Sequence, residues 1–542
     1  MRTRKPRLLS LIILLAAAGL AAGPGTGGLT GSAQAATAPR PVAGGTLTIA
    51  YVPFATHIDV NAANISTLNE VALYFYETLF DRDGSGKLVP LLAKEEQVSP
   101  DGLAVTLKLQ TGVRFHDGVP FNAAAVKWNL ERKIQKKQPL NDVLPIRSVE
   151  EVDALTVRIN LTRPAPSLKA FLSDKTFSMY SPAFVERVGD NALKQQASGT
   201  GPFTVAEFRP NEVLRLKKNP NYWQKDLPYL DEVIFRIVPD INARATMLQA
   251  GDADMALALS APDIEKLKTM RGFRVLRQMG SHQYYITINT RKPPLDDVRV
   301  RRALNHAVDK AGIIKTVLLG NAIPATAPYI NATVDGYARA GVYAYDPERA
   351  KTLLDEAGWK VGTGGIRQKD GKRLSLELIT RKGAVPGDFE SAELIQGMLR
   401  AIGIDARLAV LESATFISRV TKPPEQADYD LVNFSVNIFA GDAEFVMRTF
   451  YHTSAFAPKY YNRAYYSSPQ VDRWIDESAR AVTRAERDRL YARIIKQVFD
   501  DAPIIQLVDA FQLAAIRDTV HGVYLAGAQN NWPAKYAWKE KR

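Results

Sequence analysis

The chain has 542 residues, a formal net charge of +13 and no cysteine. The lack of cysteine excludes disulfides, thiolate nucleophiles, cysteine-based metal sites and an acylated lipoprotein anchor. The basic residues are spread along the chain and no basic stripe is interleaved with aromatic residues, so a nucleic-acid partner is not expected. A chain of this length is long for a single core, and we expect two or three lobes.

The first residues have the pattern of a secretory signal. Basic residues at positions 2, 4, 5 and 7 precede an apolar stretch from 8 to 22, and the sequence AQA at 33–35 forms a cleavage site. An uncleaved anchor is the alternative, but the apolar run falls short of the ~18 residues that span a bilayer. We expect export through the Sec pathway, cleavage after Ala35 and a periplasmic protein.

Alternation and helical spacing place the further elements in chain order. Strands are expected at 45–50, 105–109, 155–161, 285–290, 374–380, 403–408, 429–434 and 502–507. Helices are expected at 70–80, from Asn122 onward, within 295–310, at 346–357 and 389–401, from Ser468 onward and at 484–500. Asn122, Asp346 and Ser468 are the expected N-caps. Between 374 and 408 the βαβ rhythm predicts a partly parallel sheet with helices on its faces.

The stretch from 105 to 132, VTLKLQTGVRFHDGVPFNAAAVKWNLER, has the most distinctive pattern. After the strand, two glycines, an Asp-Gly pair and a proline predict a turn. His116 and Asp117 in that turn look like catalytic residues. No nucleophile or metal cluster accompanies them, so we expect a structural turn.

This stretch resembles the signature of the family 5 solute-binding proteins of ABC importers, the receptors for peptides, nickel and opines. Ala125 stands where that family usually has Asp, and Asn122 where it has Thr. Further segments resemble the family from residue 45 to about 523, among them GTGPF at 199–203, DVRVRRALNHAVD at 297–309 and YDPERAKTLLDEAG at 345–358. The matching signature residues are Gly112, Val113, Phe115, His116, Asp117, Gly118, Pro120, Phe121, Ala123, Val126 and Arg132.

The resemblance implies an α/β fold of the type II periplasmic binding protein class, with two lobes, an extra small domain and a hinge, as in cluster C. We expect a signal peptide at 1–35, a large lobe made of 36–80, 198–283 and 503–542, a small domain at 81–197 and a second lobe at 284–502. The chain is expected to cross between the lobes near 280–289 and 503–508. Closure about these crossings would bury a solute.

The resemblance also implies ligand contacts. In dipeptide receptors of the family an arginine after a Leu-x-Leu strand holds the ligand carboxylate, and Arg381 and Lys382 lie at the matching place. Peptide receptors hold the amino terminus with an aspartate after a Gly-Trp pair, which this chain lacks. Asp442 is therefore either an ammonium partner or a helix cap. The other predicted ligand contacts are Tyr51, Phe54, Asn437 and Phe439.

No catalytic residue, metal ligand or cofactor is expected. The six histidines form no His-x-His or His-x-x-x-His pair. His452 lies in the region where the nickel receptors use histidine, and a surface position is the alternative. Asp252 and Asp254 have no further acids at calcium-loop spacing. Serine-hydrolase and zinc-peptidase motifs are missing from the sequence.

The sequence therefore predicts a monomeric periplasmic receptor that delivers a peptide-like or other small polar solute to an inner-membrane ABC permease. The alternatives within the family are a receptor for a nickel chelate, an opine or glutathione. Outside it, an exported hydrolase and a folding helper or signalling receptor remain open. The sequence does not identify the solute.

Overall fold

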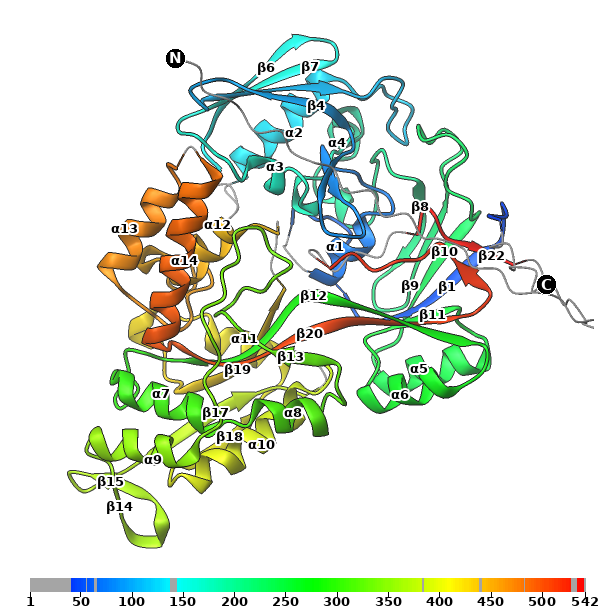
Figure 1. Ribbon diagram of the computed structural model, residues 1–542. Helices are drawn as coiled ribbons and strands as arrows, with labels where there is room; N and C mark the ends of the chain where they lie inside the picture. Colours follow the sequence, from blue (N-terminus) through cyan, green and yellow to red (C-terminus); the bar gives the residue numbers. More distant parts are fainter. Residues whose placement is uncertain are drawn as a thin grey trace, which may run out of the picture. The chain divides into compact units, whose positions relative to one another are not determined.

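Two long neighbouring strands, β12 (Phe273–Ile288) and β20 (Ile504–Arg517), run through the middle of the protein (Figure 1). The computed structural model describes residues 40–54, 56–62, 66–136, 144–382, 385–437, 441–481, 483–527 and 534–540. The two strands pair antiparallel, with a register shift between Met279 and Gln283. They belong to an eleven-stranded mixed sheet ordered β18-β17-β19-β12-β20-β11-β1-β10-β9-β8, with β13 beside β20.

One half of this sheet, here called the β1 half, lies beyond β20. Its first strand is parallel to both of its neighbours, β10 and β11. The helices α5 (Ile241–Ala250) and α6 (Ala261–Thr269) bury Leu248 and Ile264 against Ala50 and Ala515 of the sheet. The strands are β1 (Thr46–Tyr51), β8 (Phe203–Arg209), β9 (Val213–Lys218), β10 (Glu232–Ile237) and β11 (Met255–Leu257).

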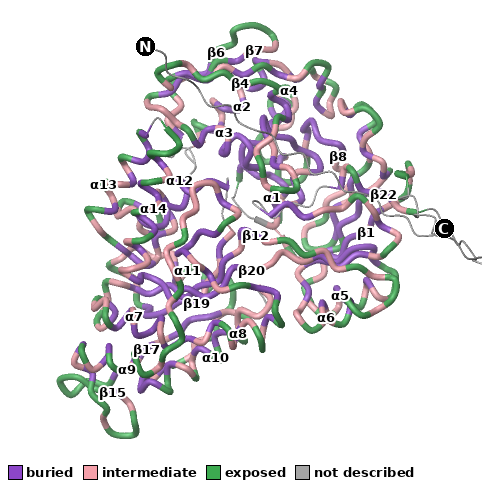
Figure 2. The backbone as a smooth tube through the Cα atoms, in the orientation of Figure 1, coloured by how far each residue is buried: buried purple, intermediate pink, exposed green. Residues whose placement is uncertain are grey.

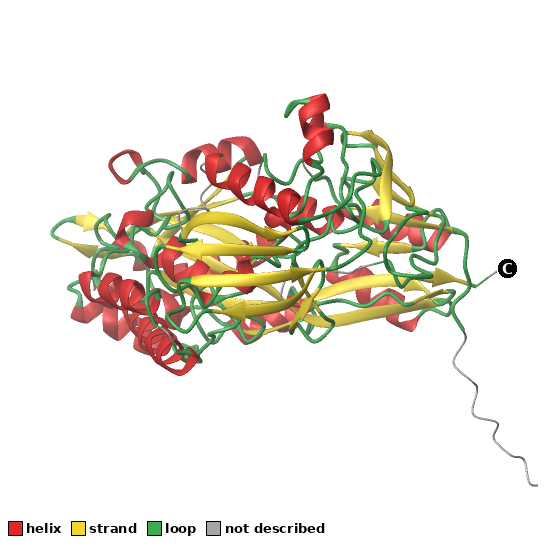
Figure 3. Ribbon diagram, turned by 90° about the horizontal axis from the view of Figure 1, so that it is seen from above, coloured by secondary structure: helices red, strands yellow, loops and turns green. Residues whose placement is uncertain are grey.

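The other half, here called the β17 half, has parallel pairing of β17 with β18 and β19. Helices cover both of its faces, as Figure 3 shows from above. One face carries α7 (Val298–Ala307), α8 (Lys310–Thr316), α9 (Pro347–Glu356) and α10 (Asp388–Ala401). The remaining helices are α11 (Ser413–Val420), α12 (Ala443–Val446), the π-helix at Met447–Tyr451, α13 (Pro469–Ser478) and α14 (Arg484–Asp501). The strands are β13 (Ala322–Pro324), β17 (Ser375–Thr380), β18 (Asp405–Val410) and β19 (Leu431–Asn437).

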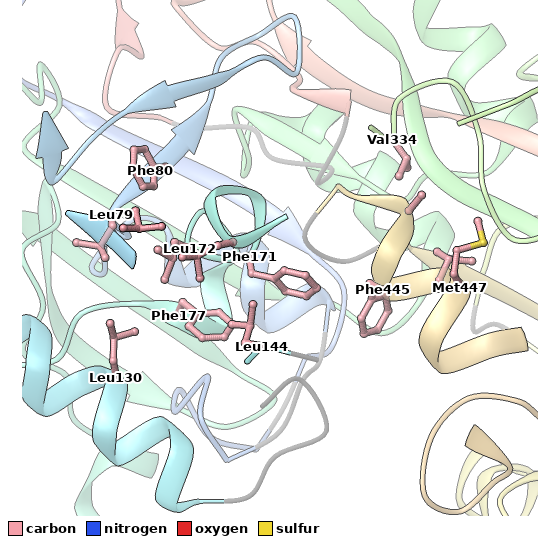
Figure 4. Close-up of a cluster of buried hydrophobic side chains, with 14 of the residues drawn as sticks. Leu79, Phe80, Leu130, Leu144, Phe171, Leu172, Phe177, Val334, Phe445 and Met447 are labelled. Atoms are coloured by element: carbon pink, nitrogen blue, oxygen red, sulfur yellow. The ribbon is translucent and has the colours of Figure 1, made fainter. Parts of the chain in front are cut away.

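A separate antiparallel sheet, ordered β4-β5-β7-β6, packs with α2 (Ala123–Gln135). Its strands are β4 (Ala93–Val98), β5 (Ala104–Leu109), β6 (Ile146–Asp153) and β7 (Thr156–Leu161). A buried hydrophobic cluster joins this region to the helices after β19. Figure 4 shows Phe171 and Phe177 on one side of this cluster and Phe445 and Met447 on the other.

Short elements complete the described chain. The helices are α1 (Ser66–Ala72), α3 (Leu168–Phe171) and α4 (Pro182–Val188), with 3-10 turns at Lys175–Phe177, Ala192–Lys194, Thr363–Gly365, Pro424–Gln426 and Thr453–Ala455. The strands are β2 (Phe80–Arg82), β3 (Leu88–Pro90), β14 (Lys360–Val361), β15 (Arg367–Lys369), β16 (Lys372–Arg373), β21 (Val520–His521) and β22 (Trp538–Lys539). The hairpin around β15 is largely exposed, whereas β20 and β1 are mostly buried (Figure 2).

The His-Asp-Gly turn docks on the segment that leads into β8. The amide of His116 donates to the carbonyl of Gly199 at 2.9 Å, and its Nε2 lies 3.0 Å from the carbonyl oxygen of Gly201. Burial lowers the pKa of His116 to about 4, so the ring is neutral at pH 7 and Nε2 donates. Asp117 accepts from the hydroxyl of Ser181 at 2.6 Å. Both residues therefore act as connectors between segments.

Two glycines allow this docking to be close. A Cβ on Gly199 would lie 2.1 Å from the carbonyl oxygen of Phe75, and a Cβ on Gly201 would lie 2.6 Å from the carbonyl carbon of the same residue. The amide of Gly201 donates to that carbonyl at 3.2 Å. Only glycine fits where two backbones approach this closely.

One prediction about local structure differs from what is found. The helix expected at 70–80 ends at Ala72, because the carbonyls of Tyr74 and Phe75 accept from the segment entering β8 and Phe80 begins a strand. The segments expected to cross between the lobes, 280–289 and 503–508, fall largely within the long strands β12 and β20. Arg301 of α7 donates to backbone carbonyls.

The predicted signal peptide, residues 1–35, lies outside the described residues. Among the helices that are described, none is long and apolar enough to cross a membrane.

Replacing Gly201 by alanine tests the close approach. We expect Gly201→Ala to lower the free energy of unfolding by about 2–4 kcal/mol, because the new methyl group overlaps backbone that cannot move away cheaply. Gly397→Ala, in an exposed position of α10 with no atom within 4 Å of the added Cβ, is the matched control. That control is expected to be neutral or up to about 1 kcal/mol more stable. Equal effects in urea unfolding would contradict the interpretation.

Candidate solute-binding site

Predicted ligand contacts gather where two parallel strands end. Arg381 directly follows β17, and Asn437 is the last residue of β19. Because β17 and β19 run parallel, their carboxyl ends lie at the same edge of the sheet, which is where open α/β sheets bind ligands. β12 runs antiparallel to β19 and places His282 opposite Asn437. Burial lowers the pKa of His282 to about 4.

Arg381 is half-buried among aromatic rings. Its Cζ lies 4.9 Å from the ring centroid of Phe416 and 5.7 Å from that of Phe434. Burial lowers the pKa of this arginine, and the negative charge of Asp388 opposes the shift. Within the described chain its guanidinium has no hydrogen bond and no carboxylate at ion-pair distance. The neighbouring Lys382 is exposed, with its Nζ 5.2 Å from the ring centroid of Phe389.

Asp388 stands at the start of α10, close to Arg381. Its Oδ1 accepts from the amide of Phe389 at 2.8 Å. Burial raises the pKa of Asp388 to about 7, although this hydrogen bond and Arg381 both act against the rise. Near pH 7 this carboxyl therefore neutralises the arginine only in part.

The carboxylate of Asp442 is bound by groups of the protein itself. It is buried, accepts from the amide of Glu444 at 2.9 Å as the N-cap of α12, and lies 3.5 Å from Nη1 of Arg487. Burial raises its pKa to about 6, and Arg487 opposes the shift. This is the geometry of the helix-cap alternative.

The two aromatic residues predicted from the first loop lie in the β1 half. Tyr51 is 1% exposed, and its hydroxyl donates to Glu70 and to the carbonyl of Thr67. Phe54 is half-buried and stacks on Phe208 with ring centroids 5.9 Å apart. The structure does not bring them together with Arg381. Phe439 lies outside the described residues.

Sequence reasoning missed three residues of this region. His282 is paired with the end of β19, and Phe434 lies on β19 next to Arg381. Arg463 lies 4.9 Å from the ring centroid of Phe434. The sequence offered one signal for Arg463, its place shortly before the predicted cap at Ser468. Whether such a loop residue lies next to a strand that is distant in sequence can be decided only from the three-dimensional structure.

The small sheet region contacts the β17 half beside this edge. The guanidinium of Arg82, on β2, donates to the carbonyl of Gly441 at 3.1 Å and pairs with Asp335 at 3.3 Å. Glu444 pairs with Arg163 at 3.5 Å and accepts from the hydroxyl of Ser167. These polar contacts surround the hydrophobic cluster of Figure 4 and hold the two regions together.

No group of three or more metal-ligating side chains occurs in the described part of the chain. His452 caps a 3-10 turn, where its Nδ1 accepts from the amide of Ser454 at 3.1 Å. Its ring lies 3.8 Å from the carboxylate of Asp476.

Comparison with known proteins decides the family. Residues 87–458 match the model described as Bacterial extracellular solute-binding proteins, family 5 Middle. The chain belongs to this family. It is a solute-binding protein of the class that serves ABC importers. Glutathione-binding protein GsiB of Pectobacterium atrosepticum is 30% identical over 474 residues, which are 87% of this chain and 90% of that protein.

Solved structures of family 5 proteins share the fold. NikA from Brucella suis in complex with Fe(III)-EDTA is 26% identical, with a TM-score of 0.81 over 92% of this chain and 100% of that chain. NikZ from Campylobacter jejuni in complex with Ni(L-His) is 24% identical, with a TM-score of 0.81 over 91% and 99%. The fold is therefore that of a type II periplasmic binding protein, as expected. GsiB is named as a binding protein.

A buried polar cluster lies where β12 and β20 change register in this family 5 protein. The side chain of Gln283 donates to Asp509 at 2.8 Å and to the carbonyl of Ala327 at 3.0 Å. Burial raises the pKa of Asp509 to about 7, and hydrogen bonds from Gln283 and Asn331 oppose the rise. The carboxyl is therefore protonated in the folded protein at pH values where it is ionised in the unfolded chain.

This difference predicts a pH dependence of stability. Between about pH 4 and 7 the folded state binds one proton more than the unfolded state at Asp509, so the free energy of unfolding should fall as pH rises, by up to about 4 kcal/mol. Asp509→Asn should remove this contribution and be the more stable protein at pH 8. Urea unfolding of both proteins at pH 5 and pH 8 measures the effect. The same pH dependence in both proteins would contradict it.

Proposed function

We propose that this protein is the periplasmic receptor of an ABC importer and that it binds a small peptide-like anion where β17 and β19 end. The guanidinium of Arg381, half-buried and without a carboxylate partner in the described chain, is the observation that carries this proposal. A carboxylate is the partner that such a guanidinium binds best, through two parallel hydrogen bonds. Asn437, at the end of β19, and His282, opposite it on β12, supply further polar groups.

The relatives support a peptide-like solute. GsiB of Pectobacterium atrosepticum is named for glutathione, a tripeptide with two carboxylates, and it aligns over most of both chains. AgaA, a neighbour in structure with a TM-score of 0.78 and 25% identity, was solved with agropinic acid. A peptide or opine with a free carboxylate is therefore the first class of solute to test. Asp442 is not available to bind the amino terminus of an ordinary peptide, because its carboxylate is paired with Arg487.

The two predicted lobes would act as a clamp about β12 and β20. Closing on a solute removes water from the polar contacts and strengthens them, and the closed form is the state that the permease recognises. We propose that the protein works as a monomer without a cofactor, and that cleavage after Ala35 releases it into the periplasm. The expected domain boundaries, 36–80 with 198–283 and 503–542, 81–197, and 284–502, remain a prediction.

Binding measurements test the proposal. Native mass spectrometry of the purified protein should detect a co-purified solute, and calorimetry should detect binding within a panel of glutathione, tripeptides, opines and nickel–histidine chelates. An empty protein with no heat and no thermal shift across the panel would contradict the receptor assignment.

Three variants test the role of Arg381. Arg381→Ala should weaken binding of the carboxylate solute about ten- to a hundredfold, because a charge-assisted bidentate contact is lost. Lys382→Ala, which removes an exposed cation, should change the affinity less than about threefold. Arg407→Ala, which removes an exposed arginine of β18, is the control for the loss of one positive charge. If Arg381→Ala binds as tightly as the control, the solute lies elsewhere.

A further inference from the structure

A second guanidinium without a partner lies beside the first. Arg463 stands in the loop before α13, and its Cζ lies 4.9 Å from the ring centroid of Phe434 and 5.4 Å from that of Tyr461. Its Nε is buried and has no hydrogen-bond partner among the described residues. No carboxylate of the described chain lies at ion-pair distance from it. Two loops far apart in sequence thus bring Arg381 and Arg463 to one aromatic ring.

The pKa shifts of neighbouring groups agree with this geometry. Burial lowers the pKa of Arg381, and the charge of Arg463 lowers it further. Burial raises the pKa of Tyr285 and of Tyr461, and Arg463 opposes both rises. The acid that acts on Arg381 is Asp388, whose pKa burial raises to about 7. Two cations therefore share this edge with one partly protonated carboxyl.

Arg301 and Arg367 show how this protein holds buried arginines that belong to its scaffold. Arg301 donates to the carbonyls of Leu295, Asp296 and Asp501 at 2.7–2.9 Å. Arg367 donates to the carbonyls of Ile402 and Trp359 and to the carboxylate of Asp355. In the described chain, Arg244 and Arg487 have a buried Nε without a partner, but Arg244 still donates to backbone carbonyls and Arg487 pairs with Asp442. Arg381 and Arg463 differ from all four, because neither guanidinium has a hydrogen bond or an ion pair within the described residues.

Aromatic rings alone do not compensate these charges. A cation over a ring is attracted by the electrons of the ring, but the ring does not accept hydrogen bonds from the five in-plane N–H donors of a guanidinium. Burying a charge without a counter-ion is unfavourable, because the charge loses its water. A bound anion would supply both the missing charge and the missing acceptors.

We propose that Arg463 and Arg381 together bind a dianionic solute against Phe434, either two carboxylates of one molecule or one doubly charged group such as a phosphate. This inference rests on the proposed function and narrows its solute class. A monocarboxylate would leave one of the two guanidiniums unpaired. Arg381 alone would select any carboxylate, whereas Arg463 adds discrimination for the second negative charge.

Selectivity is the decisive measurement. Glutathione, its glycine amide, glutarate, butyrate and inorganic phosphate are titrated by calorimetry into the wild type, Arg463→Gln and Arg407→Gln at constant ionic strength. The wild type should prefer glutathione to its amide, and glutarate or phosphate to butyrate, by about tenfold or more. Arg463→Gln should abolish this preference, with dianion affinity falling about ten- to a hundredfold and monoanion affinity changing less than about threefold. Arg407→Gln should behave as the wild type.

Thermal unfolding of the ligand-free proteins gives a second readout. Arg463→Gln should unfold at the same temperature as the wild type or higher, because it removes a half-buried charge without a partner. A lower unfolding temperature together with unchanged affinities would show a scaffold role and overturn the proposal.

In the calorimetric titrations, comparing glutarate with phosphate distinguishes a site for two carboxylates from a site for one doubly charged group.

The other outcomes of the titrations also decide whether the site binds dianions. A wild type that binds monoanions and dianions equally, or that keeps its preference in Arg463→Gln, overturns the dianion proposal and leaves the receptor assignment intact. A wild type that binds none of these five probes overturns it as well. The receptor assignment is then judged separately by the co-purified solute in native mass spectrometry.

Discussion

The pairing of β12 with β20 is the constraint on which the rest of the structure depends. Each strand belongs to both halves of the eleven-stranded sheet, from Phe273↔Arg517 in the β1 half to Thr287↔Ile504 in the β17 half. This pair therefore joins the two halves into one sheet. The register shift beyond Met279 and the polar cluster at Asp509 lie in its middle, where a strand pair bends and twists most readily.

Much of the local structure follows from sequence because it depends on short-range chemistry. Asn122, Asp346 and Ser468 each accept from a backbone amide three residues on, as capping residues should. The family pattern also indicated a structural turn at His116, and the contacts with Gly199 and Gly201 explain why a neutral imidazole is suited to it. The end of α1 at Ala72 was not predictable, because its cause is a backbone more than 120 residues away.

The candidate site was predictable only in part. Arg381 and Asn437 could be placed from the strands they terminate, since parallel strands end at a common edge. Arg463 could not, because Phe434, the ring it shares with Arg381, becomes its neighbour only when the loop before α13 packs against β19. Tyr51 and Asp442 were chosen by motif position, and the structure shows both of their polar groups bonded within the protein.

The order of strands also affects how this chain can fold. β1, the first strand made, needs β10 and β11 on its two sides, and β11 in turn needs β20, close to the carboxyl end. The β17 half needs the same strand beside β12. Pairings so distant in sequence form slowly. Neither half of the sheet can be completed before residues 504–517 are available for pairing. A chain that passes through a membrane pore amino end first would therefore stay unfolded along most of its length until these residues have crossed. Such a chain suits export in the unfolded state.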